Sequence, residues 1–380
     1  MKVRFFIDGP DGLISFDAEH TKIPLPWGLD PGGAAITYGP YFAAIADFLS
    51  GSDWQALLTA LGQHLDRVVF WQEIESIEVI SQKHGAFYHV AQLRVEISGR
   101  VFSLALNCAF GAQKQTFLES EFALLRELNK RFPLGMIPSA YVLGGSPGAV
   151  QGDGLALRAF IAEWFEGFHE FHLSRKSVGE SPGIKVWGVR NSESFLDAHE
   201  TLLLYSQASA ILTAYFDAYS FQQIYPWHHA AGDFILKKQQ DGVELRLITV
   251  RGYRPLLTLE PGGMDKWIPI VHFFINLSLR MRLDRLDGTG EMVWANSACL
   301  HGVVSGFLKK WEQKAKDDPG LPAAPQVLEV LRSFTHEEWL PFAGLVLDDG
   351  LVEADEFQFI QPRLEEHVVS LCEVLKAMDG

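Results

Sequence analysis

Apolar and polar residues alternate through much of residues 71–108, and this two-residue period predicts β-strands. The clearest alternation runs over residues 87–97, and the glycine-containing residues 98–100 after it are typical of a tight turn. Strands over residues 74–80 and 101–108 flank this stretch. The pattern therefore predicts a three-stranded antiparallel meander.

Apolar residues then recur at helical spacing over residues 115–131, with Glu121 among the charged residues predicted on the hydrated side. Pro133 ends this helix. Strands over residues 140–143 and 155–163 complete the order strand, strand, strand, helix, strand, strand.

Glycine and proline are frequent in residues 1–40, so the regular elements predicted there are short. Two helices follow over residues 41–49 and 54–65, and Ser52 or Asp53 is suited to cap the second one. The chain therefore begins with an extension of short elements and two helices.

A helical period dominates after Trp164. Helices are predicted over residues 193–219, 265–283, 293–316, 325–333 and 362–377. A hairpin-like pair of strands is predicted within residues 234–250, and a short strand or turn within residues 345–352.

These elements predict an α+β protein with four segments. In chain order they are an N-terminal extension with helices, a small β-rich lobe, a helical large lobe and a C-terminal helical extension. Their predicted bounds are residues 1–70, 71–165, 166–316 and 317–380.

Charge and cysteine content narrow the choice of partner and compartment. The formal net charge of −15 repels phosphate backbones and anionic lipid, so nucleic acid is not expected as a partner. Cys108, Cys299 and Cys372 lie far apart, which favours free buried thiols in the reducing cytoplasm. The apolar run 267–281 contains His272 and is shorter than the roughly 20 residues of a membrane span, so it is interpreted as a buried helix.

The order of elements in residues 71–316, roughly two-thirds of the chain, resembles the protein-kinase-like fold, and in particular its aminoglycoside phosphotransferase and choline-kinase branch. The resemblance implies a small lobe of five antiparallel strands plus one helix, and a mainly helical large lobe. It also implies a small-molecule or protein ligand between the lobes, with a nucleotide and Mg²⁺ as the cofactors of such a fold.

The resemblance assigns cofactor-binding positions in the small lobe. Asn107 stands where the family has the lysine that clamps the phosphates, and Asn is neutral. Glu121 matches the glutamate that pairs with that lysine, although a solvated helix charge explains it equally well. Residues 160–167, with Glu163, resemble the hinge that meets an adenine.

The loop 225–236 resembles the family's catalytic loop, and two alignments remain open. In one, Asp233 is the catalytic base and Lys238 replaces a metal-binding asparagine. In the other, which fits the following strand better, Asp233 is a metal ligand and His228 takes the position of the base. Thr249 then replaces the second magnesium-binding aspartate.

Neither alignment completes the set of residues that ATP-dependent transfer needs, so the sequence predicts a pseudokinase-like binding or regulatory protein. The alternative is an atypical small-molecule phosphotransferase that uses His228 and Asp233. A purely structural interpretation also remains, in which His229 caps the loop and Asp233 accepts backbone amides. Arg251 and Arg254 are suited to hold an anionic ligand, or to form salt bridges with surface carboxylates.

A third hypothesis is a metal-dependent enzyme. His169 and His172 have an His-x-x-His spacing that brings two imidazoles together on a helix or in a tight turn. His228 and Asp233 complete the predicted ligand set. An aromatic-rich structural turn is the alternative interpretation of residues 167–172.

Overall fold

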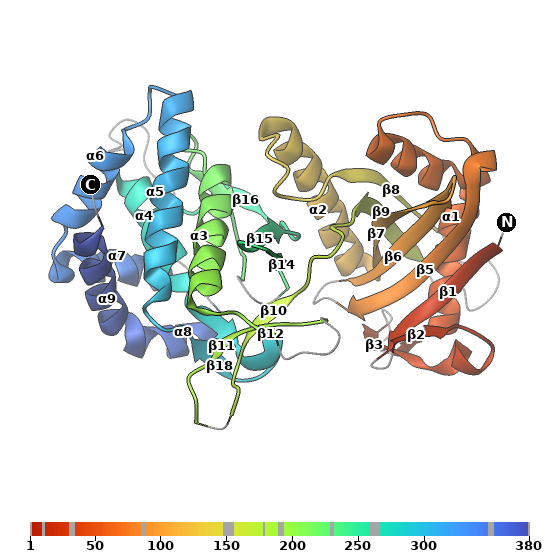
Figure 1. The fold of residues 1–380 in the computed structure, drawn as a ribbon, viewed down its shortest axis with the longest axis horizontal. Coiled ribbons are helices and arrows are strands. Elements are labelled where there is room, and N and C mark those ends of the chain that lie inside the picture. The colour runs from red at the N-terminus through yellow and green to blue at the C-terminus, as the bar shows by residue number, and fades with distance from the viewer. Residues whose placement is uncertain are drawn as a thin grey trace. The chain divides into compact units, whose positions relative to one another are not determined.

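A computed structural model of the chain describes residues 2–9, 12–29, 35–84, 88–146, 156–177, 179–188, 194–228, 232–257, 267–348 and 353–378. The chain divides into two compact units, Met1–Glu166 and Gly167–Gly380. The first unit contains the large β-sheet, and the second contains most of the helices (Figure 1). The protein is therefore a mixed α+β protein, as the sequence predicts.

A seven-stranded sheet with the order β2-β1-β5-β6-β7-β9-β8 forms the first unit. Its strands are β1 (Lys2–Gly9), β2 (Gly12–Ser15), β5 (Ile74–His84), β6 (His89–Ile97), β7 (Arg100–Phe110), β8 (Ala140–Ser146) and β9 (Leu157–Glu163). All five strands predicted from the sequence are present, but a five-stranded antiparallel lobe is wrong. Two N-terminal strands extend the sheet, and β1 pairs in parallel with β5.

The strand β1 also contradicts the expectation that elements within residues 1–40 are short. Val3, Phe5 and Ile7 occupy alternate positions along it and pack against the core of the unit. Apolar residues at alternate positions from Val3 to Ile7 form this strand, and most of the glycines and prolines of residues 1–40 come later in the sequence. The remaining short elements are η1 (Glu19–Lys22), β3 (Pro24–Leu29), β4 (Ala35–Thr37) and η2 (Trp71–Glu73).

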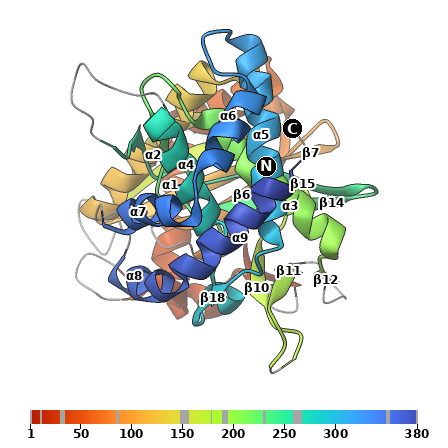
Figure 2. The same ribbon diagram turned by 90° about the vertical axis from the view of Figure 1, so that its left-hand side faces the viewer.

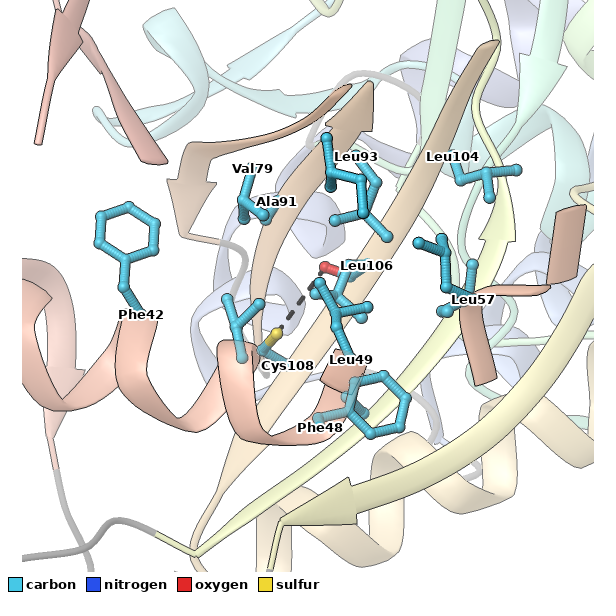
Figure 3. Close-up of a cluster of buried hydrophobic side chains, with 14 of the residues drawn as sticks. Phe42, Phe48, Leu49, Leu57, Val79, Ala91, Leu93, Leu104, Leu106 and Cys108 are labelled. Atoms are coloured by element: carbon cyan, nitrogen blue, oxygen red, sulfur yellow. Dashed lines mark hydrogen bonds between the residues drawn. The ribbon is translucent and has the colours of Figure 1, made fainter. Parts of the chain in front are cut away.

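The long helix α1 (Tyr38–Leu65) covers one face of this sheet. Its backbone is non-helical from Gly51 to Trp54, and three consecutive residues there, beginning at Ser52, have positive φ. The break lies between the two helices that the sequence predicts. Buried residues on either side of it meet alternate residues of β5, β6 and β7, and Figure 3 shows Leu49, Leu57 and Leu106 in this core.

The opposite face of the sheet packs against α2 (Ala112–Arg131), which lies along β7 and β9. Ala159 and Ile161 face α1. Phe160 lies between them in the strand, so the side chain of Phe160 points to the opposite face of the sheet. There it contacts the ring of Phe122 from α2, with ring centroids 5.7 Å apart. The first unit is therefore a sheet between two helical layers.

The second unit consists mainly of packed helices. They are α3 (Ala198–Tyr215), α4 (Trp267–Arg280), α5 (Cys299–Asp317), α6 (Ala324–Ser333), α7 (His336–Asp348), α8 (Ala354–Ile360) and α9 (Leu364–Ala377), with η3 (Leu286–Gly288) and η4 (Gln361–Arg363). The helix α9 lies beside α5 and α7 (Figure 2). Two glycines let α5 approach α3 closely, because a Cβ at Gly306 would lie 2.0 Å from the carbonyl oxygen of Ser206.

Short strands connect these helices. They are β10 (Phe171–Ser174), β11 (Gly183–Val186), β12 (Ser194–Phe195), β13 (Gln222–Ile224), β14 (Phe234–Gln239), β15 (Gly242–Leu247), β16 (Tyr253–Pro255), β17 (Leu283–Arg285) and β18 (Met292–Trp294). The predicted hairpin within residues 234–250 is the pair β14–β15. The predicted helices 193–219 and 293–316 are too long at their starts, where β12 and β18 precede α3 and α5.

The strand or turn predicted within residues 345–352 is wrong for its first part, because α7 continues to Asp348. The apolar run at 345–347 resembles a strand when it is taken alone. Trp339, Ala343, Val346 and Leu347 are nevertheless buried at helical spacing, so tertiary burial of one helix face decides the conformation. Residues 349–352 lie outside the described part.

Candidate functional site

The predicted catalytic loop contributes Asp233 to a buried ion pair. Asp233 has no exposed surface, and its carboxylate accepts two hydrogen bonds from the guanidinium of Arg251, each 2.5 Å long. The same carboxylate accepts the backbone N–H of His228 at 2.7 Å. Asp233 therefore joins the start of the loop to the segment that follows the hairpin β14–β15.

Local backbone geometry places Asp233 at this junction. Gly232 has a φ of +80°, a left-handed conformation that glycine adopts without steric cost. Directly after Asp233 the chain enters β14, and the N–H of Ile248 donates to the carbonyl of Asp233 at 2.7 Å. The hairpin thus holds the backbone while the side chain turns toward Arg251.

A second pair of opposite charges lies near the same loop. Arg280, at the end of the apolar helix α4, is 4% exposed, donates to the hydroxyl of Tyr225 and lies 4.8 Å from the centroid of that ring. Glu356 of α8 is 7% exposed, and its carboxylate lies 3.5 Å from Nη1 of Arg280. Tyr225 itself begins the loop, and its peptide bond to Pro226 is cis.

His228 lies where these two pairs meet. Its Nδ1 is 3.8 Å from a carboxylate oxygen of Glu356, and 36% of its side-chain surface is exposed. Burial lowers the pKa of His228, and the guanidinium groups of Arg251 and Arg280 add to this shift against two carboxylates. The imidazole is therefore uncharged near neutral pH and can accept a proton.

These contacts bear directly on the alternatives left open for the loop. Asp233 does accept a backbone amide, as the structural interpretation expects, although His229 lies outside the described residues. Arg251 forms a salt bridge with the buried Asp233. Arg254 is exposed on β16. The roles of base and metal ligand stay predictions.

The two histidines of the metal hypothesis do not lie on a helix or in a tight turn. His172 is in the strand β10, and His169 pairs through its backbone with Leu236. In extended chain, residues three positions apart point to opposite sides, so these imidazoles do not converge. Within the described residues, no group of three or more His, Cys, Asp or Glu side chains is suited to hold a metal ion.

The small-lobe candidates lie in the first unit. Asn107, 9% exposed, is on β7 opposite Val90 and Phe160. Glu121 was expected on the hydrated side of α2, and this is wrong, because it is 4% exposed. The hydroxyl of Tyr88 donates to its carboxylate. A tyrosine hydroxyl thus meets the glutamate for which the family resemblance implies a lysine partner.

Glu163 ends the strand β9 and ties it to the segment before β8. Its carboxylate accepts the N–H of Ser139 at 3.2 Å, and its own N–H donates to the carbonyl of Ser139 at 2.9 Å. Its described hydrogen bonds are therefore to backbone groups within the first unit.

Sequence reasoning missed a buried polar cluster under α1. Ser81 and His89 are 2% and 1% exposed, and Oγ of Ser81 lies 2.7 Å from Nε2 of His89. The ring of Tyr41 meets that of His89 edge-on at 4.9 Å. Burial raises the pKa of the neighbouring Cys108 thiol well above its usual value. The thiol therefore stays protonated, and the cluster is a buried polar network without solvent access.

Tyr225, Arg280 and Glu356 were also missed. One signal was present in the sequence, since Arg280 is the single charged residue of α4, whose other residues are mostly apolar. A charge at the end of a buried helix requires a polar partner. The identity of that partner, 76 residues further along the chain, was not accessible from local pattern.

No family model matches this chain, and no curated protein sequence matches it. Among the described residues, no helix is both long enough and apolar enough to cross a membrane.

Proposed function

We propose that this protein has a kinase-like fold and acts as a binding or regulatory protein that does not transfer phosphate from Mg·ATP. The five strands β5 to β9 share one sheet, with α2 between the third and the fourth. This is the element order of the family's small lobe, and a mainly helical unit follows it in the chain. The fold assignment rests on that order.

The buried pair of Asp233 and Arg251 carries the functional part of the proposal. A magnesium ion in such a site depends on carboxylates together with substrate phosphates. Here both carboxylate oxygens of Asp233 already accept hydrogen bonds from a guanidinium, which also brings positive charge to the place of a cation. Thr249 stands where the second carboxylate is expected, so the chain offers no replacement at that position.

The small-lobe residues support the same conclusion. Asn107 supplies no charge for a phosphate clamp, and Glu121 is occupied by the hydroxyl of Tyr88. A buried glutamate with a tyrosine partner stabilises the position of α2 without binding an anion. At the positions that the family resemblance assigns, this chain thus has neither the lysine that would clamp the phosphates nor an unoccupied carboxylate pair for Mg²⁺.

Thermal unfolding with millimolar ATP, with and without Mg²⁺, tests the proposal. A ligand present at 100 times its Kd stabilises the native state by about 2.7 kcal/mol. We expect no magnesium-dependent rise in Tm and no release of ADP. A rise of several degrees that needs both ATP and Mg²⁺ would count decisively against it.

The second candidate is an atypical phosphotransferase with His228 as general base. The observation that favours it is the lowered pKa of a partly exposed imidazole between two charged pairs. His228→Gln is the informative variant, because Asp233→Ala would also leave Arg251 without its partner. This candidate requires that the wild-type protein release ADP when a hydroxyl-bearing acceptor is present. The release should be lost in His228→Gln, whose Tm should be unchanged. Equal rates of ADP release in the wild type and in His228→Gln would exclude this candidate.

A further inference from the structure

The carboxylate of Glu356 is held loosely for a group so deeply buried. It lies 3.5 Å from Arg280, whereas charge-assisted pairs are usually about 2.7–2.9 Å long, and it lies 3.8 Å from the uncharged imidazole of His228. In the same region, the oxygens of Asp233 lie 2.5 Å from Arg251. One ion pair of this cluster is therefore tight and bidentate, and the other is long.

The cationic side of the long pair is built without any residue of α8. Arg280 belongs to α4, while Tyr225 and His228 belong to the loop before β14. Tyr225 accepts a hydrogen bond from Arg280 and also lies under its guanidinium, so a loop residue helps to orient the arginine. Glu356 then contributes the anion from a separate segment of the chain.

We propose that Arg280, Tyr225 and His228 form a binding site for a small carboxylate, and that Glu356 occupies this site as an internal ligand. The planar guanidinium matches the geometry of a carboxylate, and a buried arginine is costly without an anion. An external carboxylate competes with Glu356, because two anions beside one guanidinium repel each other. This inference rests on the cluster itself and does not depend on the kinase-like fold.

The test is rescue of Glu356→Ala by formate. Removal of the internal carboxylate lowers Tm and leaves a space beside Arg280. Formate should then raise the Tm of this variant by about 3 °C when it is present at ten times its Kd, beyond any effect of chloride at equal ionic strength. Should the variant fold poorly, its refolding yield with and without formate gives the same comparison.

Two further variants make the test specific. Arg280→Met combined with Glu356→Ala should lose the formate effect. Glu366→Ala is the matched control, because Glu366 pairs with another buried arginine, Arg282, but its side chain is 55% exposed. When this carboxylate is removed, water can take its place beside Arg282. Formate should not stabilise this control beyond chloride.

In the wild-type protein, saturating formate should also speed amide hydrogen exchange in residues 354–360 severalfold, because Glu356 is displaced. The proposal is overturned if formate stabilises Glu356→Ala no more than chloride does, or if the Arg280→Met double variant responds equally. Rescue by inorganic phosphate and not by formate would also overturn it, since the site would then not be one for carboxylates.

Discussion

The two units of this protein differ in how many charged side chains they bury. In the first unit Ser81 meets His89 inside a hydrocarbon core beneath α1, and among its described residues one carboxylate, that of Glu121, is buried. The second unit buries ionisable residues of both signs. Among the described residues they include Asp233, Arg280, Arg282, Asp284, Glu356 and His367, each at most 7% exposed.

This difference corresponds to two ways in which buried side chains stabilise a fold. A sheet face built from alternate apolar positions gains free energy from each side chain separately, at roughly 25 cal/mol per Å² of apolar surface. A buried charge contributes only when its partner is present, since an uncompensated ion in the interior costs several kcal/mol. We therefore expect the first unit to lose stability in proportion to volume removed, and the second to depend on individual partners.

The largest effect is expected for Arg251→Met, which leaves the carboxylate of Asp233 buried with only a backbone donor. The free energy of unfolding should fall by about 3–5 kcal/mol, as measured by urea denaturation. Arg254→Met, at an exposed arginine on the adjacent strand β16, is the control and should change it by less than about 0.5 kcal/mol. Similar losses in both variants would contradict the assignment of the pair.

In the first unit, Leu106→Ala removes a fully buried side chain from β7 (Figure 3). The expected loss is about 2–5 kcal/mol, from transfer free energy plus the cavity. Val101→Ala on the same strand is the control, because Val101 is 51% exposed and should lose far less. Hydrogen exchange resolved by peptide would show whether the loss is confined to the first unit.

The charge of Asp284 should make the second unit less stable as the pH rises. Burial raises the pKa of Asp284 to about 7, although the N–H groups of Leu173 and Arg285 donate to its carboxylate. A raised pKa means that the native state binds a proton which the unfolded state releases near pH 4. Stability from this group is complete below about pH 4 and is lost by about pH 7, up to about 4 kcal/mol.

Asp284→Asn isolates that contribution from other titrations. The difference in unfolding free energy between wild type and variant should shift in favour of the variant between pH 4 and pH 7, and stay constant above. Urea denaturation at several pH values measures it. A difference independent of pH would show that Asp284 is ionised throughout.

The smallest of these effects is expected for Ser81→Ala, which removes the hydrogen bond between the hydroxyl of Ser81 and the ring of His89. The cost should be about 1–2 kcal/mol, because one buried hydrogen bond is lost. Thermal unfolding measures this loss of stability. Ser103→Ala is the comparison, because Ser103 is another buried serine of the same sheet. A loss as large as that of Arg251→Met would erase the contrast between the two units.

Much of the fold follows from local pattern. The strands β5, β6 and β7 and the helices α2, α6 and α9 lie close to their predicted positions, because their periods repeat over many residues. Only part of the site could be predicted from the sequence. His228, Asp233 and Arg251 were identified from the sequence, but the direct pairing of the last two was not.

The misses share a cause. Glu121 was expected in water on the basis of its charge, but it is buried and its carboxylate accepts a hydrogen bond from the hydroxyl of Tyr88. The strand β1 joins the sheet through parallel pairing with β5, more than 70 residues away. Neither contact leaves a signal within one helical turn or one strand.

The amino-acid sequence alone determined the periods of strands and helices, because backbone geometry repeats every 2.0 or 3.6 residues and side chains must match it. The tertiary structure decided which charges meet. The partners Arg251 and Asp233, and Arg280 and Glu356, lie 18 and 76 residues apart. Their energy depends on the burial that the whole unit creates, and no local stretch of sequence contains that information.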